Sequence, residues 1–226
     1  MNVITTNGDR WYEKDGRWLP SVTTIIGRYL NIGPKDEEAR ARWDQLAKRG
    51  SRIHDLLAKP HISRGEWDQL PKDIRYALHA RQRFVDAYGF RRENCELALA
   101  SVELGFAGRL DDAGRIPEGR ILVDYKSGRL RLRSLRPQLG AYYGLYVARY
   151  PRRKIFGALG VGLSPVNGDY IVESLSLGDL KRGLSEFKKA KQEVENDTNS
   201  WAIRDKTSPA NGQDTARSEA AGEVGG

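Results

Sequence analysis

The chain has 226 residues, of which 39% are hydrophobic and 30% are charged, so it can bury one sizeable core as an ordinary globular protein. Its net charge of +8 favours a polyanionic partner, with nucleic acid as the first candidate and an inert basic surface as the alternative. A single cysteine excludes an intrachain disulfide framework and any cysteine-rich zinc or iron–sulfur site, and without an apolar leader or a membrane-spanning run we expect a cytoplasmic protein with no membrane partner.

The N-terminal part of the chain is predicted to form a hairpin followed by helices. Asp15 and Gly16 form a tight-turn dipeptide between aromatic residues, which predicts the hairpin, and Ser21 is a favourable N-cap for the apolar segment after it. A longer helix is expected from Pro34, because acidic residues crowd its first turn and basic residues follow, with an interruption at Gly50. The predicted elements are a hairpin over 10–19, helices over 22–30, 34–59 and 72–88, and a loop or short helical turn over 59–70.

The second part of the chain is predicted to form a sheet with one embedded and one closing helix. Short apolar runs predict the strands, and Leu139, Tyr142 and Tyr146 recur at helical spacing. The predicted elements are strands over 93–103, 106–111, 121–125, 155–163 and 169–177, a turn over 114–119, and helices over 137–150 and 180–194. We therefore expect one α/β domain over 1–195, with a hairpin and helices over 1–90 and a central mixed β-sheet flanked by helices over 91–195, followed by a disordered tail over 196–226.

Three polar residues follow apolar strand sequence and could carry chemistry. Asp111 ends one predicted strand, while Asp124 and Lys126 end the next one and share a face as residues i and i+2. Two carboxylates at the ends of adjacent strands can hold Mg²⁺ or Mn²⁺, and an ammonium beside them can orient a water or neutralise a phosphate. The alternative is a surface Asp–Lys pair beside a turn. The apolar run before Asp124 and the second acid favour a site.

These motifs resemble the RecB-type branch of the PD-(D/E)XK nuclease superfamily. The segments GRLD, ILVDYKSG and QLGAYY occur in the family's order, and RGSRIH is similar to its upstream G-x-x-x-H element. The resemblance covers roughly residues 20–146 and implies a restriction-endonuclease-like core, a mixed sheet flanked by helices. In this chain Leu110 stands where the family often has Pro, and the cysteine cluster of the iron–sulfur members is missing. The matching positions are His54, Asp111, Asp124, Tyr125, Lys126, Gln138 and Tyr142.

The resemblance implies roles for these residues. It makes His54, Asp111, Asp124 and the Tyr125 backbone carbonyl ligands of one or two Mg²⁺ or Mn²⁺ ions, with Lys126 assisting the attacking water. Glu103, at the start of the strand leading to Asp111, is considered as an additional ligand, with a plain strand-edge acid as the alternative. The predicted catalytic residues are Asp111, Asp124, Lys126, Gln138 and Tyr142.

Gln138 and Tyr142 are four residues apart on one predicted helix, so they share a face. They could touch substrate phosphate or hold the catalytic loop, and the alternative is a core-facing tyrosine with a polar neighbour. Their place after the D-x-K strand favours the first interpretation.

A run of arginines follows Lys126 and predicts contact with DNA. On an extended segment, alternate residues would place several guanidinium groups on one side, where they suit phosphate recognition. A solvated charge run is the alternative. The predicted DNA-binding residues are Arg129, Arg131, Arg133 and Arg136, with Arg49 and Arg52 beside the His54 turn as weaker candidates.

The sequence therefore predicts a metal-dependent DNA nuclease. The resemblance implies an exonuclease of DNA recombination, repair or phage DNA processing. A structure-selective or restriction-type endonuclease and a non-catalytic DNA-binding protein are the alternatives. The chain has no phosphate-binding G-x-x-x-x-G-K-[ST] loop, so we expect no nucleotide cofactor, and it either works on ends and exposed strands or depends on a separate helicase or recombinase. The sequence does not indicate an oligomeric state.

Overall fold

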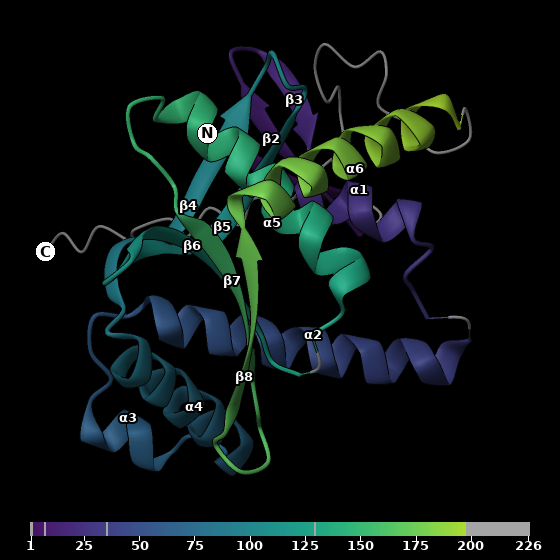
Figure 1. Ribbon diagram of the computed structural model, residues 1–226. Helices are drawn as coiled ribbons and strands as arrows, with labels where there is room; N and C mark the ends of the chain where they lie inside the picture. Colours follow the sequence, from purple (N-terminus) through teal and green to yellow (C-terminus); the bar gives the residue numbers. More distant parts are fainter. Residues whose placement is uncertain (1, 7, 35, 129, 198–226) are drawn as a thin grey trace, which may run out of the picture.

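The structure, a computed structural model, describes residues 2–6, 8–34, 36–128 and 130–197. These residues form two sheets and six helices (Figure 1). The small antiparallel sheet contains β1 Val3–Thr6, β2 Asp9–Lys14 and β3 Arg17–Pro20, in that order. The main sheet has the order β4 Arg91–Ser101, β5 Phe106–Ile116, β6 Gly119–Lys126, β7 Gly157–Leu163 and β8 Tyr170–Ser176. The helices are α1 Val22–Tyr29, α2 Glu37–Ala58, α3 Arg64–Asp68, α4 Lys72–Tyr88, α5 Leu132–Arg149 and α6 Leu177–Asn196.

The main sheet is mixed because β6 and β7 are parallel, whereas the other neighbouring pairs are antiparallel. A parallel pair needs a crossover connection, which α5 supplies. Asp124 lies beside Gly160 and Lys126 beside Gly162, so both side chains lie where the two parallel strands end. This edge of the sheet holds the D-x-K motif.

Helices cover both faces of the main sheet (Figure 1). Residues of α1, α5 and α6 share one buried apolar cluster with Leu122, and residues of α2 and α4 share the second with Val123 and Tyr125. Successive residues of β6 thus face opposite layers, which is why its sequence is a continuous apolar run. None of the helices in the described part of the chain is both long and apolar enough to cross a membrane.

Two faces of α5 point to different surroundings. Gly140 and Gly144 face α6, where a Cβ atom at Gly140 would lie 2.3 Å from the backbone nitrogen of Leu184. Only glycine permits such a close approach of two helices. Gln138 and Tyr142 are displaced by two residues, which is about 200° around the helix, so they point away from α6.

The predicted α/β class and the mixed sheet flanked by helices are confirmed. The predicted hairpin, the Ser21 cap and the helix over 72–88 also occur. Strand β1, which pairs with β2 beside the hairpin, was not predicted. Residues 198–226, which contain most of the predicted tail, lie outside the described part of the chain.

The predicted boundaries differ most from the structure at three places. Gly50 does not interrupt α2, because one glycine costs a helix only about 1 kcal/mol. Strand β5 continues through Gly114 to Ile116, which reduces the predicted turn to two residues. Helix α5 begins at Leu132, five residues before the expected start, because Leu135 is buried in the core and Pro137 lies inside the helix.

Candidate metal and catalytic site

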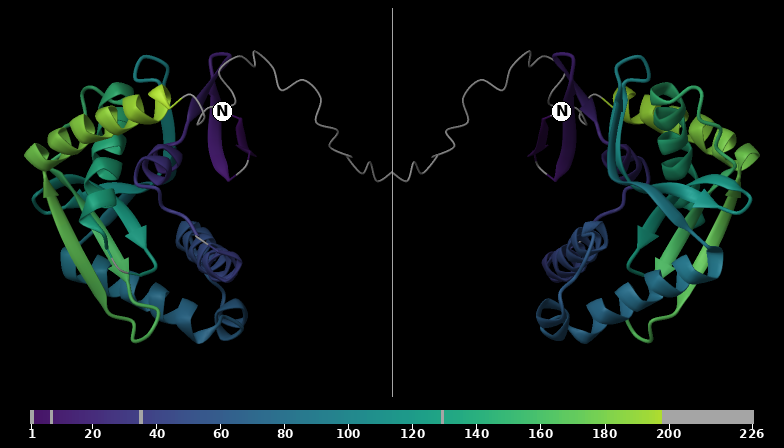
Figure 2. Two further views of the ribbon diagram at one scale, coloured as in Figure 1. Left: turned by 90° about the vertical axis from the view of Figure 1, so that its right-hand side faces the viewer. Right: turned by 90° about the vertical axis from the view of Figure 1, so that its left-hand side faces the viewer.

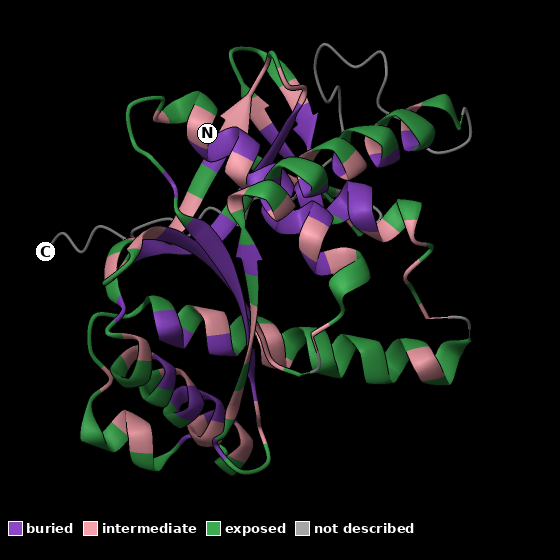
Figure 3. Ribbon diagram, viewed as in Figure 1, coloured by how far each residue is buried: buried purple, intermediate pink, exposed green. Residues whose placement is uncertain are grey.

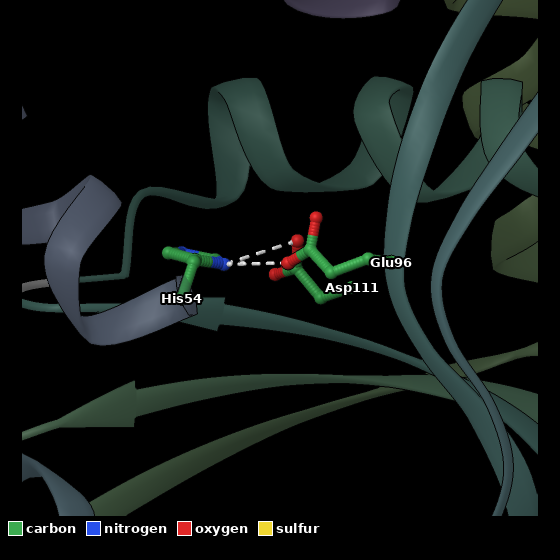
Figure 4. A group of neighbouring side chains, drawn as sticks. All are labelled: His54, Glu96 and Asp111. Carbon is green, nitrogen blue, oxygen red and sulfur yellow. Dashed lines mark ion pairs between the residues drawn. The ribbon is translucent and has the colours of Figure 1, made fainter. Parts of the chain in front are cut away.

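Three side chains from distant parts of the sequence meet at one point (Figure 4). His54 of α2 places Nδ1 3.3 Å from Oδ1 of Asp111 on β5 and 3.6 Å from Oε1 of Glu96 on β4. One ligand atom from each residue lies within 4.8 Å of the other two. Two carboxylates and an imidazole are a suitable ligand set for a divalent ion such as Mn²⁺ or Mg²⁺. The donor set therefore fits the predicted kind of metal site.

The pairing of β4 with β5 brings Glu96 to Asp111. Cys95 pairs with Asp112 and Leu97 pairs with Leu110, so Glu96 lies opposite Asp111. The backbone of Glu96 has a φ of 47°, a left-handed conformation that a non-glycine residue adopts at a cost of about 1–3 kcal/mol. The strained backbone is held by regular pairing on both sides, as is common where a side chain is positioned for function.

Sequence reasoning missed Glu96 and considered Glu103 instead. Glu103 is exposed in the turn between β4 and β5 and does not belong to the group around His54. No local motif marks Glu96, because its place depends on the register of two strands. Nothing else in the sequence of β4 singles it out, because that strand also contains Glu93 and two arginines.

A half-buried arginine fixes the helix that carries His54. Arg92 donates from Nη1 to the Leu57 carbonyl at 2.8 Å and from Nη2 to Oδ2 of Asp112 at 2.9 Å. Asp112 is fully buried and also accepts a hydrogen bond from the Tyr125 hydroxyl at 3.0 Å. This network ties α2 to β5 one residue away from Asp111, so it sets the distance between His54 and the sheet.

Asp124 is the more enclosed of the two acids that line the catalytic cavity, with 2% of its surface exposed. Gln138 donates from Nε2 to its Oδ1 at 2.6 Å, and Lys126 Nζ lies 2.7 Å from its Oδ2. Oδ2 is thus paired with the Lys126 ammonium, and a carboxylate oxygen has a further lone pair that a cation can use. Asp111 accepts a hydrogen bond from the Tyr125 backbone N–H at 2.7 Å, which joins the two halves of the site.

A cavity of about 300 Å³ opens over these residues. The structure brings seven of the sequence-predicted residues to its wall, together with Arg10, Thr23 and Arg109, which sequence reasoning did not select. Gly108 lets the Tyr142 ring lie against β5, since a Cβ atom there would be 2.7 Å from the ring. Arg109 pairs with Oε2 of Glu96 at 2.6 Å. The predicted residues at the wall are His54, Asp111, Asp124, Tyr125, Lys126, Gln138 and Tyr142.

The pKa values in the site follow from burial and nearby charge. Burial alone would lower the pKa of His54, but its contacts with Asp111 and Glu96 outweigh burial and raise that pKa to about 10. Burial raises the pKa of Asp124 to about 6, opposed by the charge of Lys126. Burial also acts to lower the pKa of Lys126, yet Asp124 and Asp111 raise it overall, so Lys126 is an ammonium at neutral pH. In the metal-free protein, a proton on His54 balances the carboxylates.

We expect His54 to stabilise the metal-free fold at neutral pH and to lose that effect in alkali. Its pKa rises from 6.5 to about 10 on folding, so the stabilisation is complete below pH 6.5 and is lost as pH rises through 10. At about 1.4 kcal/mol per pKa unit, the effect is on the order of a few kcal/mol. Urea unfolding with EDTA present, from about pH 6 to about pH 10, should show the stability difference between wild type and His54→Gln shrinking. A difference that stays constant over this range would contradict the expectation.

The predicted DNA-binding arginines separate into distinct groups. Arg136 forms two hydrogen bonds to Glu186 of α6, at 3.0 and 2.7 Å, and Arg49 donates to the Ser127 carbonyl at 3.3 Å, so both hold the fold together. Arg52 is exposed on another face of α2 from His54. The predicted extended segment was wrong, because Arg131 is the N-cap of α5 and Arg133 lies in its first turn, both exposed. Arg129 lies outside the described residues.

Comparison with known proteins gives matches among solved structures alone. No protein-family model and no curated protein sequence matches the chain. A candidate exonuclease from Eubacterium rectale is 10% identical, with a TM-score of 0.41, over 82% of this chain and 69% of that one. An alkaline exonuclease from Laribacter hongkongensis is 12% identical, with a TM-score of 0.33, over 76% of this chain and 90% of that one. The second enzyme has also been solved in complex with dAMP. Exonucleases are therefore among the structures that the chain resembles, and its chemistry is inferred from its own side chains.

Proposed function

We propose that the protein is a metal-dependent nuclease that hydrolyses phosphodiester bonds in DNA. The observation that carries the proposal is the convergence of Asp111, Asp124 and Lys126 with His54 on the wall of one cavity. The enclosed oxygen of Asp124 and the group around His54 offer oxygen and nitrogen ligands to a cation. The positive charge of the chain suits a polyanionic substrate.

The cation would be held by Asp111, Glu96 and His54, together with Asp124 and the Tyr125 backbone carbonyl. When bound, such an ion polarises a phosphoryl oxygen and lowers the pKa of a water molecule. Glu96 takes the place that the sequence analysis considered for Glu103. Arg109, paired with Glu96, limits the negative charge that gathers when the site is empty of substrate.

Lys126 and the residues of α5 position the reacting groups. Because the pKa of Lys126 is raised, its ammonium donates hydrogen bonds, and we assign it to the attacking water or the negative charge on the scissile phosphate. Gln138 holds the Asp124 carboxylate in one orientation through Nε2. Burial, with the charges of Asp124 and Asp111, raises the pKa of Tyr142 well above its ordinary value, so its hydroxyl remains a hydrogen-bond donor.

End-labelled linear DNA and closed circular DNA together test this function. We expect loss of the linear substrate in Mg²⁺ or Mn²⁺, no loss with EDTA, and an intact closed circle, as for an exonuclease. Cleavage of the circle would instead indicate an endonuclease. Binding of DNA without cleavage under any of these metal conditions would indicate a non-catalytic DNA-binding protein and refute the proposal.

A further inference from the structure

A second cavity of about 810 Å³ adjoins the catalytic one. The two share Arg10, Thr23, Lys126 and Gln138 as wall residues, so they form a continuous groove. The outer part of the groove lies among β2, α1, the start of α5 and the N-terminal half of α2. Figure 2 shows the small sheet and α2 on the same side of the main sheet, one above the other. A ligand that reaches the catalytic cavity through this groove passes between the small sheet and α2.

One large aromatic side chain lies on the α2 side of the groove. Trp43 lines the outer cavity and has 44% of its surface exposed, although a tryptophan usually buries most of its area. Trp43 and His54 are eleven residues apart, which is three helical turns plus about 20°. They therefore lie on one face of α2, about 16 Å apart along the helix axis. Residues 40–48 are all exposed, and this half of α2 extends beyond the main sheet (Figure 3).

We propose that this groove leads a single strand of DNA to the catalytic site, with Trp43 stacking on a base and Arg10 holding a phosphate. The inference rests on the proposed function and adds a substrate class to it. Exposed aromatic rings in positively charged grooves bind single strands, because every unpaired base offers a face on which to stack. In a duplex, those faces are already covered by neighbouring bases, so a duplex would gain little from Trp43.

Arg10 is positioned to take a phosphate near the cation. It is exposed on β2, lines both cavities, and its side chain forms no ion pair with any described residue. Its backbone is fixed, since its N–H donates to Thr24 Oγ1 at 2.9 Å and its carbonyl accepts from the Ser21 N–H at 2.9 Å. A guanidinium on a rigid support is well suited to phosphate recognition. The Arg28 side chain, by contrast, forms an ion pair with Asp9, which lines the same cavity.

The start of α5 adds further positive potential along the groove. Ser134 in its first turn lines the outer cavity, exposed Arg133 lies in the same turn, and exposed Arg131 is the N-cap. The helix has no side-chain cap and no acid in its first turn. The positive end of the helix dipole and the two arginines therefore favour a phosphate backbone that follows the groove.

Binding should be measured without cleavage, in a Lys126→Ala background, by anisotropy of a short labelled oligonucleotide. We expect Trp43→Ala to weaken binding of a single strand roughly 5- to 100-fold, and Trp43→Tyr to recover most of it. The same change should leave binding of a blunt duplex within about twofold. Phe156→Ala is the matched control, because Phe156 is an exposed aromatic residue, 56% accessible, beside Gly119 at the opposite end of β6.

The outcomes separate this inference from the proposed function. The proposed groove would be refuted if the Trp43→Ala variant bound a single strand as tightly as the Lys126→Ala background does. It would also be refuted if Trp43→Ala weakened the binding of single strand and duplex equally. Neither result would affect the nuclease, which depends on cleavage by wild type. Conversely, a chain that never cleaves DNA, but binds single strands through Trp43, would refute the nuclease and leave the groove supported.

Discussion

Lys126→Ala and Asp124→Asn are each expected to reduce the rate of DNA hydrolysis by a factor of about 10²–10³ or more. Lys126 is the cationic group placed 2.7 Å from the most enclosed carboxylate of the site. Without it, no donor remains at this position to stabilise charge on the phosphate. Asp124→Asn removes a negative oxygen from the predicted ligand set while it preserves the shape of the side chain. Both variants should be assayed on linear DNA at saturating Mg²⁺ and Mn²⁺.

Lys188→Ala is the matched control for the loss of positive charge. Lys188 is exposed on α6 and lines neither the catalytic cavity nor the groove. The Lys188→Ala variant should hydrolyse DNA at the wild-type rate. Circular dichroism should show that each variant is folded. Wild-type rates from both Lys126→Ala and Asp124→Asn would place hydrolysis elsewhere in the protein.

Glu96→Gln is expected to weaken cation binding about 10- to 100-fold or more, and Asp111→Asn should do the same. Their oxygens lie 3.6 and 3.3 Å from the same nitrogen of His54, so each variant removes charge from one small group of ligands. Isothermal titration with Mn²⁺ measures the affinity directly. Nuclease activity of Glu96→Gln should recover in part at high Mn²⁺ concentration, because the defect is in binding of the ion.

Glu103→Gln provides the control that distinguishes the two candidate glutamates. Glu103 is exposed in the turn between β4 and β5, outside the group around His54. Its replacement should leave Mn²⁺ affinity unchanged. If Glu103→Gln weakened the affinity and Glu96→Gln did not, the group assigned here would be wrong.

The sequence by itself predicted the features that depend on neighbouring residues. The apolar run before Asp124 identified a buried strand, and the two-residue spacing placed Lys126 on the same face as Asp124. The four-residue spacing of Gln138 and Tyr142 placed both on one face of α5, and both line the cavity. Such patterns are local, because side-chain direction repeats every two residues in a strand and every 3.6 in a helix.

The tertiary structure alone decided which distant residues meet. Glu96 reaches Asp111 through the register of β4 against β5, and Arg10 reaches the cavity because the small sheet lies beside the main one. Arg136 was predicted to bind DNA but pairs with Glu186, since α5 begins earlier than Pro137 suggested and packs closely on α6. Strand register and helix packing depend on many weak contacts between remote segments, and no single stretch of sequence contains that information.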